Sequence, residues 1–266
     1  MIKSKLPKIG LKLWNIFIDY NYSSNFDTLE LALNLKDFFI LNKIIKLKEY
    51  FCGKELSLHS RTSRIFSNNK YKAKIPFFDD IEMLFLKAEI KVSRIIGAKE
   101  LIFHLKQEKL DEKEKIKLAE ILCFAEKNNV EMIYESNHKF YSKTCLDVLN
   151  SFPRLNYNLD LGHLNTSIGC KTLGMDLNNF LDKIKSRVVY IHAHNNNGIN
   201  DEHKSLDKGT LDWREVLNRL NIFKARKIII EIKTKEDILN TKRLLEDYLR
   251  KREKNETRGK TSTKRV

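Results

Sequence analysis

Short apolar segments alternate with longer amphipathic ones along almost the whole chain. The short segments are rich in β-branched and large apolar residues, and they predict strands over 9–14, 28–33, 56–60, 100–105, 131–136, 156–160, 187–194 and 227–232. Apolar positions recur at helical spacing between several of these segments, over 81–96, 113–128, 213–220 and 235–250. Gly97 follows the first of these helical patterns, at a position where a glycine commonly ends a helix.

Strands that alternate with helices in this way pair in parallel, because each crossover connection has to pass over the sheet. The strand and helix units fill about 250 residues, the usual length of a closed barrel. Polar residues also recur at the ends of successive strands, whereas an open sheet would gather its site at one switch point. We therefore predict an α/β protein, a single-domain (β/α)8 TIM barrel over residues 1–249.

Composition favours a globular protein without a membrane anchor. Hydrophobic residues make up 42% of the 266 positions, enough for a sizeable core. The longest apolar run is far shorter than the ~20 residues that span a bilayer, and no cleavage site follows the basic start. The four cysteines form no C-x-x-C pair, so we expect free thiols and a cytoplasmic location.

The chain is strongly basic, with a formal net charge of +15. Residues 250–266 contain eight Lys or Arg and two Glu, and they show no apolar periodicity after Leu249. We predict that this segment is a basic, disordered tail. The basic charge favours polyanions or phosphorylated small molecules as partners, although it also fits a surface that only maintains solubility.

Ionisable residues occur at the ends of the predicted strands. In a parallel barrel all these ends lie on one face, which is the face where barrel enzymes carry their active sites. Residues two apart point to the same side of a strand, so Glu135 shares its side with Ile133, and Glu231 with Ile229. The residues at or just after strand ends are His59, His104, Glu135, Asp160, His163, His192, His194 and Glu231.

Carboxylates and imidazoles that converge in this way cannot all stay ionised and unpaired. A divalent cation resolves the conflict, and mixed oxygen and nitrogen ligands suit Mn, Co, Zn, Fe or Mg. One such histidine alone is more often satisfied by a backbone carbonyl, but chance would scatter the whole set among helices and strand bases. No Walker or G-x-G-x-x-G loop is present, so we expect no nucleotide cofactor.

Several short motifs occur in an order that resembles a known superfamily. They resemble the xylose-isomerase-like barrels, which include sugar phosphate isomerases and epimerases and the related AP endonuclease family 2, or endonuclease IV. The resemblance covers roughly residues 8–250. The motifs are Glu100-Leu-Ile-Phe-His104, Ile133-Tyr-Glu135, Leu159-Asp160-Leu-Gly-His163, His192-Ala-His-Asn-Asn-Asn-Gly198, Asp201-Glu-His203 and Ile230-Glu231.

The epimerase-like pattern implies a metal-dependent isomerase or epimerase of a small sugar or sugar phosphate. It places the metal on Glu135, Asp160, His192 and Glu231. The two glutamates would also transfer protons, because a metal that polarises a carbonyl stabilises the enediolate. Further substrate contacts are expected from His163, His194, Arg61 and Lys106. His194 also fits a residue that supports a metal ligand without touching the metal, and the two cations also fit a solvated surface.

The endonuclease branch offers an alternative, a zinc-dependent AP endonuclease that cleaves DNA at abasic sites. That branch uses a three-metal cluster, which activates water and binds phosphate oxygens. The basic charge of the chain fits a nucleic-acid partner. Positions for the additional metal ligands are occupied by His59, His104, His163, Asp201 and His203.

Three sequence features favour the isomerase branch. Asp160-Leu-Gly-His163 is nearer the D-x-G-H of isomerases than the D-T-C-H of the endonucleases, and only nine positions separate His192 from Asp201. The Tyr and Asn signature of the endonucleases is missing after His59. Asn195, where an acidic residue is common, departs from the isomerase pattern and leaves the substrate open. A barrel that binds a metabolite or metal without turnover is a third alternative.

Overall fold

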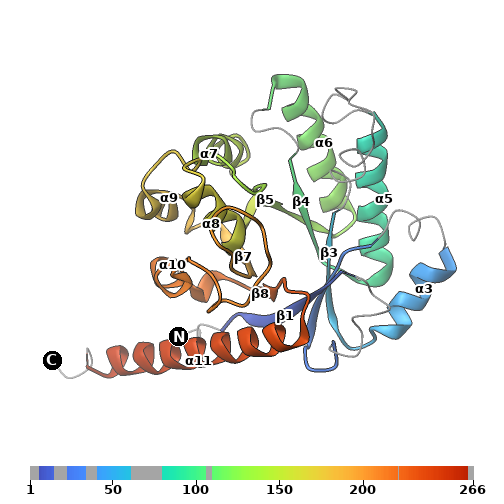
Figure 1. The fold of residues 1–266 in the computed structure, drawn as a ribbon. Coiled ribbons are helices and arrows are strands. Elements are labelled where there is room, and N and C mark those ends of the chain that lie inside the picture. Colours follow the sequence, from blue (N-terminus) through green and yellow to red (C-terminus); the bar gives the residue numbers. More distant parts are fainter. Residues whose placement is uncertain are drawn as a thin grey trace.

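The computed structural model describes residues 6–14, 23–33, 41–60, 80–105, 110–220 and 222–262. Parallel strands form a closed barrel in which each strand pairs with its sequence neighbours and β8 closes onto β1, as Figure 1 shows. This confirms the predicted single-domain TIM barrel. The strands are β1 (Lys8–Leu13), β2 (Thr28–Leu31), β3 (Glu55–His59), β4 (Glu100–His104), β5 (Glu131–Glu135), β6 (Asn156–Asp160), β7 (Val188–Ala193) and β8 (Lys227–Ile230).

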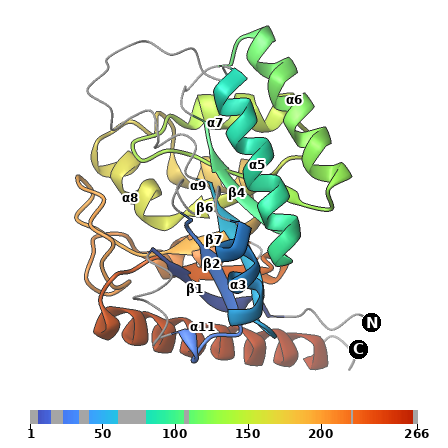
Figure 2. The ribbon, with the colours of Figure 1, turned by 90° about the vertical axis from the view of Figure 1, so that its right-hand side faces the viewer.

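Helices pack around the outside of the barrel, with α5 and α6 on one side and α11 along another (Figure 2). Their apolar faces and the outward side chains of the strands form the main hydrophobic core. None of the helices within the described ranges has an apolar stretch long enough to cross a bilayer. The elements are α3 (Leu41–Tyr50), α5 (Asp80–Ile96), α6 (Glu112–Lys127), α7 (Ser142–Ser151), α8 (Leu161–Gly169), α9 (Leu177–Ile184), α10 (Trp213–Arg219), the 3-10 helix η1 (Ile222–Lys224) and α11 (Lys235–Ser262).

The inside of the barrel is filled by a small apolar layer. Ile102, Ile133, Tyr190 and Ile229 are fully buried and form a cluster of their own. A side chain at Gly10 would not fit, because its Cβ would lie 2.5 Å from Cδ1 of Ile229. The strands therefore carry apolar residues below their C-terminal ends, as the alternation predicted for Ile133 and Ile229.

The last helix differs from the sequence prediction. We expected disorder from residue 250, but α11 continues to Ser262, and residues 263–266 lie outside the described part of the chain. Its lysines, arginines and glutamates are good helix formers, so a helix already nucleated on the barrel propagates through them.

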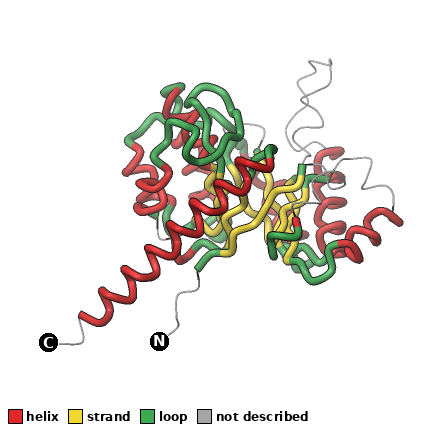
Figure 3. Tube along the Cα trace, turned by 60° about the horizontal axis from the view of Figure 1, so that its bottom comes forward, coloured by secondary structure: helices red, strands yellow, loops and turns green. Residues whose placement is uncertain are grey.

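The basic end of α11 lies at the base of the barrel, the end that holds the N-termini of the strands. Leu249 and Arg250 lie beside Pro7 and Asn25, which precede β1 and β2. Figure 3 shows the helix projecting past the barrel on this side. The basic segment is therefore remote from the C-terminal strand ends, which form the mouth of the barrel.

Candidate metal centre

The predicted ionisable residues meet at the mouth of the barrel. Strand register pairs His104 with Glu135 and Asp160 with His192, so two histidines lie next to two carboxylates on adjacent strands. Glu231 directly follows β8. These positions belong to the inward-facing series of each strand, one layer above the apolar cluster. The residues sit where their strands end, and the parallel pairing aligns those ends.

The first group of ligand atoms surrounds one side of Glu135. Nε2 of His59 lies 3.4 Å from Oε2 of Glu135, and Nε2 of His104 lies 3.5 Å from Oε1. The three residues are suitably placed for one cation, since each offers a ligand atom within 4.8 Å of the others.

The second group is central and contains the four ligands that the epimerase pattern implies. Nδ1 of His192 lies 3.1 Å from Oε2 of Glu135 and 3.5 Å from Oδ2 of Asp160. The same nitrogen lies 2.8 Å from Oε2 of Glu231. All four side chains are buried. Glu135, Asp160 and His192 offer ligand atoms within 4.8 Å of one another, and Glu231 does so together with Asp160 and His194.

The third group lies on the loop after β7. Nε2 of His203 is 3.2 Å from Oδ2 of Asp201, and Nδ1 of His194 is 3.8 Å from Oδ1 of Asp201. Nε2 of His163 lies 3.7 Å from Oδ2 of Asp201, so His163 borders this group as well. His203 adopts a left-handed φ of 52°, a conformation that non-glycine residues keep only where their surroundings enforce it.

The three groups form one continuous cluster. Glu135 belongs to both the first and the second group. Asp160 belongs to the second and also lies within ligand distance of His194, which belongs to the third. The bridging carboxylates allow neighbouring cations to share ligands, as in multinuclear sites.

Several buried atoms of this cluster lack a hydrogen-bond partner. Within the described residues they include Nδ1 of His192, Nδ1 of His194, Oδ1 of Asp201 and Oε2 of Glu231. Buried polar atoms are rarely left unpaired, and these four belong to imidazole and carboxylate groups that face one another. The donor set therefore fits the divalent cation that we predicted, with zinc, manganese and cobalt as suitable ions.

The ionisable groups strongly perturb one another. Burial would raise the pKa of Glu135, but the charges of His192 and His104 hold that pKa well below its usual range. Burial would likewise lower the pKa of His163, but Asp160 and Asp201 raise it to about 10. The raised pKa of His163 favours a protonated imidazole beside these carboxylates in the metal-free chain, and that proton competes with a metal for the ring nitrogens.

The Asp160-Leu-Gly-His163 motif has a structural explanation. Asp160 ends β6 and also caps α8, because its Oδ1 accepts a hydrogen bond from the backbone nitrogen of His163 at 2.7 Å. A Cβ on Gly162 would lie 1.9 Å from Cε1 of His194. Glycine is therefore required where α8 passes directly over the His194 ring.

Sequence reasoning missed three residues that contact the ligands. Nζ of Lys12 lies 2.7 Å from Oε1 of Glu231, and Nε2 of His192 lies 3.1 Å from Oε2 of Glu30. The side-chain nitrogen of Asn158 donates a hydrogen bond to Oε2 of Glu135. Their signal was available, since each is a polar residue at an inward position of a strand, with a large apolar residue on either side of it.

The structure does not test two of the predicted substrate contacts, and it gives Asn195 a structural role. Arg61 and Lys106 lie outside the described residues, so the structure does not place them. Asn195 is fully buried and its side chain donates hydrogen bonds to the carbonyls of Leu206 and Leu211. This asparagine, which departs from the isomerase pattern, thus holds the loop that follows β7.

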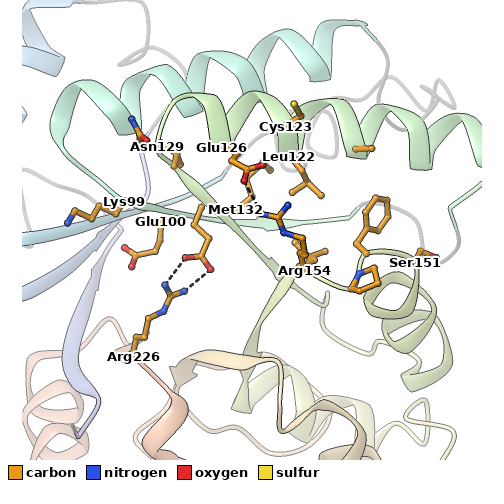
Figure 4. Close-up of a pocket in the computed structure, with 16 residues that line it drawn as sticks. Lys99, Glu100, Leu122, Cys123, Glu126, Asn129, Met132, Ser151, Arg154 and Arg226 are labelled. Atoms are coloured by element: carbon orange, nitrogen blue, oxygen red, sulfur yellow. Dashed lines mark hydrogen bonds and ion pairs between the residues drawn. The ribbon is translucent and has the colours of Figure 1, made fainter. Parts of the chain in front are cut away.

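A separate cavity of about 760 Å³ lies at the base of the barrel, at the opposite end from the candidate metal centre. Figure 4 shows the residues that line it. Four of its charged side chains pair with one another, since Arg226 forms two hydrogen bonds with Glu131 and Arg154 forms an ion pair with Glu126. None of the candidate metal-binding groups formed by the described residues borders it. We therefore assign the chemistry to the mouth.

Comparisons with known proteins agree with this geometry. The sequence pattern of a family described as "Xylose isomerase-like TIM barrel" matches residues 81–252. The uncharacterized protein MJ1311 of Methanocaldococcus jannaschii is 29% identical over 141 residues, which are 50% of this chain and 47% of that protein. The matched segment thus spans about half of that relative's length.

Solved structures resemble the chain over most of its length. A D-tagatose 3-epimerase-like protein has a TM-score of 0.71 at 19% identity, covering 91% of this chain and 97% of that one. The IOLI protein, whose structure has a bound zinc atom, has a TM-score of 0.69 at 16% identity, with 92% and 98% covered. AP endonuclease family 2 from Brucella melitensis has a TM-score of 0.62 at 13% identity, with 87% and 96% covered. At these identities the similarity demonstrates the fold alone.

Proposed function

The chain belongs to the xylose isomerase-like TIM barrel family, and we propose that it is a metal-dependent phosphodiesterase that cleaves DNA at abasic sites. One observation carries this proposal. Every ligand position that the endonuclease resemblance implies lies in a single continuous cluster, whereas a one-metal sugar enzyme needs only the central four. The cluster comprises His59, His104, Glu135, Asp160, His163, His192, Asp201, His203 and Glu231.

The charge of the cluster supports several cations rather than one. Among the described residues, five carboxylates and the ammonium of Lys12 meet here, an excess of four negative charges once the imidazoles are neutral, as metal ligation requires. The carboxylates are those of Glu30, Glu135, Asp160, Asp201 and Glu231. One divalent cation would leave half of that excess, and two would cancel it. A third makes the mouth positive, which suits an anionic phosphodiester.

The two glutamates also support hydrolysis over proton transfer to carbon. Oε1 of Glu231 is bonded to Lys12, and its Oε2 faces His192. Oε2 of Glu135 accepts a hydrogen bond from Asn158. A carboxylate base needs a free oxygen within hydrogen-bond reach of the substrate proton. In Glu231 the oxygen without a hydrogen-bond partner is Oε2, which faces His192 and is the one that the proposed cluster uses for a cation.

The position of each residue in the cluster indicates its role in the proposed reaction. Bound divalent cations supply polarisation of phosphate oxygens and activation of water. His163 and Asp201 border the open side of the cluster, where a phosphate would enter, while His192 and Asp160 are buried beneath it. The basic part of α11 lies at the base of the barrel, so it lends no support to DNA binding at the mouth.

Cleavage of a duplex containing one abasic site tests the proposal. The protein is first loaded with zinc, its metal content is measured, and cleavage is assayed at low salt beside the same duplex without the lesion. We expect cleavage at the lesion, inhibition by a chelator and loss of cleavage in Glu135→Gln. Zinc-loaded protein that leaves the abasic strand intact would overturn the proposal.

An isomerase or epimerase of a small sugar or sugar phosphate is the second candidate. It is favoured by the Asp160-Leu-Gly-His163 motif and by the nine positions between His192 and Asp201. Deuterium uptake at a substrate carbon in D₂O, abolished in Glu231→Gln, would support it. A single exchangeable Mn or Co per chain would agree with this candidate, and a chain that binds no metal would be a non-catalytic barrel.

A further inference from the structure

Four buried side chains form a closed ring beside the central metal group. Lys12 contacts Glu231, with Nζ 2.7 Å from Oε1, and also lies 3.6 Å from Oε1 of Glu30. Oε2 of Glu30 lies 3.1 Å from Nε2 of His192. Nδ1 of His192 closes the ring at 2.8 Å from Oε2 of Glu231. The ring joins β1, β2, β7 and β8, and its side chains are at most 3% exposed.

His192 and Glu231, the two candidate metal ligands in the ring, each use one atom toward the central group and the other toward the ring. Nδ1 of His192 and Oε2 of Glu231 face the central group, whereas Nε2 and Oε1 of the same residues face Glu30 and Lys12. A histidine ligand keeps its orientation when its other nitrogen donates to a carboxylate. A carboxylate with one oxygen held by an ammonium has only the other oxygen left for a cation.

We propose that Lys12 and Glu30 are positioning residues that restrict His192 and Glu231 to one ligand atom each. This inference rests on the proposed metal cluster. Glu30 selects Nδ1 of His192 as the metal-binding nitrogen, and Lys12 leaves Oε2 as the metal-binding oxygen of Glu231. Because Oε1 of Glu231 accepts the hydrogen bond from Lys12, it is not available for proton transfer at a substrate carbon. This agrees with the proposed hydrolysis.

Glu30 could instead bind a further cation with His59 and His192, since these three also offer atoms within 4.8 Å of one another. Two contacts argue against this use. A cation there would compete for Nε2 of His192, which already faces Glu30, and it would lie near the Lys12 ammonium. Repulsion between like charges in a buried site is strong, so the ammonium takes the place of a cation at Glu30.

Metal binding by Lys12→Met, Glu30→Ala and Glu30→Gln tests the proposal without any activity assay. Zinc affinity is measured by competition with a chromophoric chelator, and the visible spectrum of bound Co²⁺ reports the ligand geometry. We expect Lys12→Met and Glu30→Ala to weaken binding at the central group about 10- to 100-fold and to change the Co²⁺ spectrum. Glu30→Gln keeps an acceptor for His192 and should retain most of the affinity.

Lys227→Met is the matched control, because Lys227 is another buried lysine, paired with Glu100 at 2.9 Å at the base of the barrel. It should lose stability but keep the zinc affinity and the Co²⁺ spectrum. Unchanged binding in Glu30→Ala, or an equal loss in Lys227→Met, would overturn the proposal. If Lys12→Met does not fold, the two Glu30 variants decide. A chain that cleaves no DNA but shows these metal effects would refute the proposed function and leave this inference intact.

Discussion

The two carboxylate oxygens of Asp160 contact different residues, the backbone of His163 and the side chain of His192. Its Oδ1 accepts the hydrogen bond from the backbone nitrogen of His163 at 2.7 Å, and its Oδ2 lies 3.5 Å from Nδ1 of His192. The N-terminus of α8 is thus anchored to a residue of the central metal group. Helix capping and metal binding can be separated by substitution, because an asparagine can cap but carries no charge.

We expect Asp160→Asn to bind zinc much more weakly than the unsubstituted chain, and Asp160→Ala to bind it equally weakly. The two variants should differ in stability, since only asparagine can accept the bond from His163. The difference should be about 1 kcal/mol in the free energy of unfolding, measured in denaturant without metal. Equal stability of the two variants would contradict a capping role.

Gly162→Ala should disturb the metal centre through His194. The new Cβ would lie 1.9 Å from Cε1 of His194, so either α8 or the ring has to move. We expect a loss of about 1–3 kcal/mol in stability, typical of overpacking, together with weaker zinc binding. Gly97→Ala is the control: its φ of 82° makes alanine unfavourable, but nothing lies near its Cβ, so zinc binding should not change.

Removal of a ligand that belongs to one group should remove one ion. Among the candidate groups formed by the described residues, His104 is a member of the first alone and His203 of the third alone. We expect His104→Ala and His203→Ala each to lower the zinc content by about one ion per chain, because the neighbouring groups keep their own ligands. Elemental analysis after gel filtration measures this. A complete loss of zinc in either variant would mean that the ions bind as one inseparable unit.

The metal-free chain should become less stable as the pH rises above neutrality. The pKa of His163 is raised to about 10 and that of His192 is raised well above its ordinary value, chiefly because buried carboxylates outweigh desolvation. A pKa that is higher in the folded state stabilises the fold below the unfolded value and loses that contribution as the pH rises through the folded value. The lowered pKa of Glu135 adds nothing in this window, because that carboxylate is ionised throughout.

In the presence of a chelator, the midpoint temperature of thermal unfolding should therefore fall as the pH rises from about 6.5 to 10. With zinc the trend should weaken or reverse, because metal ligation requires the deprotonated imidazole. His163→Gln, as the control, should flatten the decline of the metal-free chain. A midpoint that rises over this range without metal would show that the imidazoles are neutral there.

Much of the barrel was predictable because strand periodicity is local. The alternation in Ile133-Tyr-Glu135 placed an apolar residue inside and a carboxylate one layer above it, and the structure has both. The end of α11 was not predictable in this way. Residues 250–262 lack an apolar stripe, so only their attachment to a packed helix explains why they are helical.

The candidate ligands could be found one by one, but their partners could not. His192 and Glu231 end predicted strands, and a parallel barrel brings such ends together. Lys12 and Glu30 could be noticed as charged residues between apolar ones in a strand, but the sequence does not say which opposite charge each of them meets. Their ring forms only because β8 closes onto β1 and places β1, β2, β7 and β8 around one corner of the mouth.

The order of apolar and polar residues thus predicted the barrel and the end at which its ionisable residues gather, since both follow from periods of two and 3.6 residues. The candidate metal ligands among those residues came from the resemblance to a family. Tertiary structure alone decided how the ligands are grouped. Whether Glu231 can act as a free base depends on Lys12, which lies more than two hundred positions away in the chain and 2.7 Å away in space. Distances of that kind depend on barrel closure and register, and local sequence does not encode them.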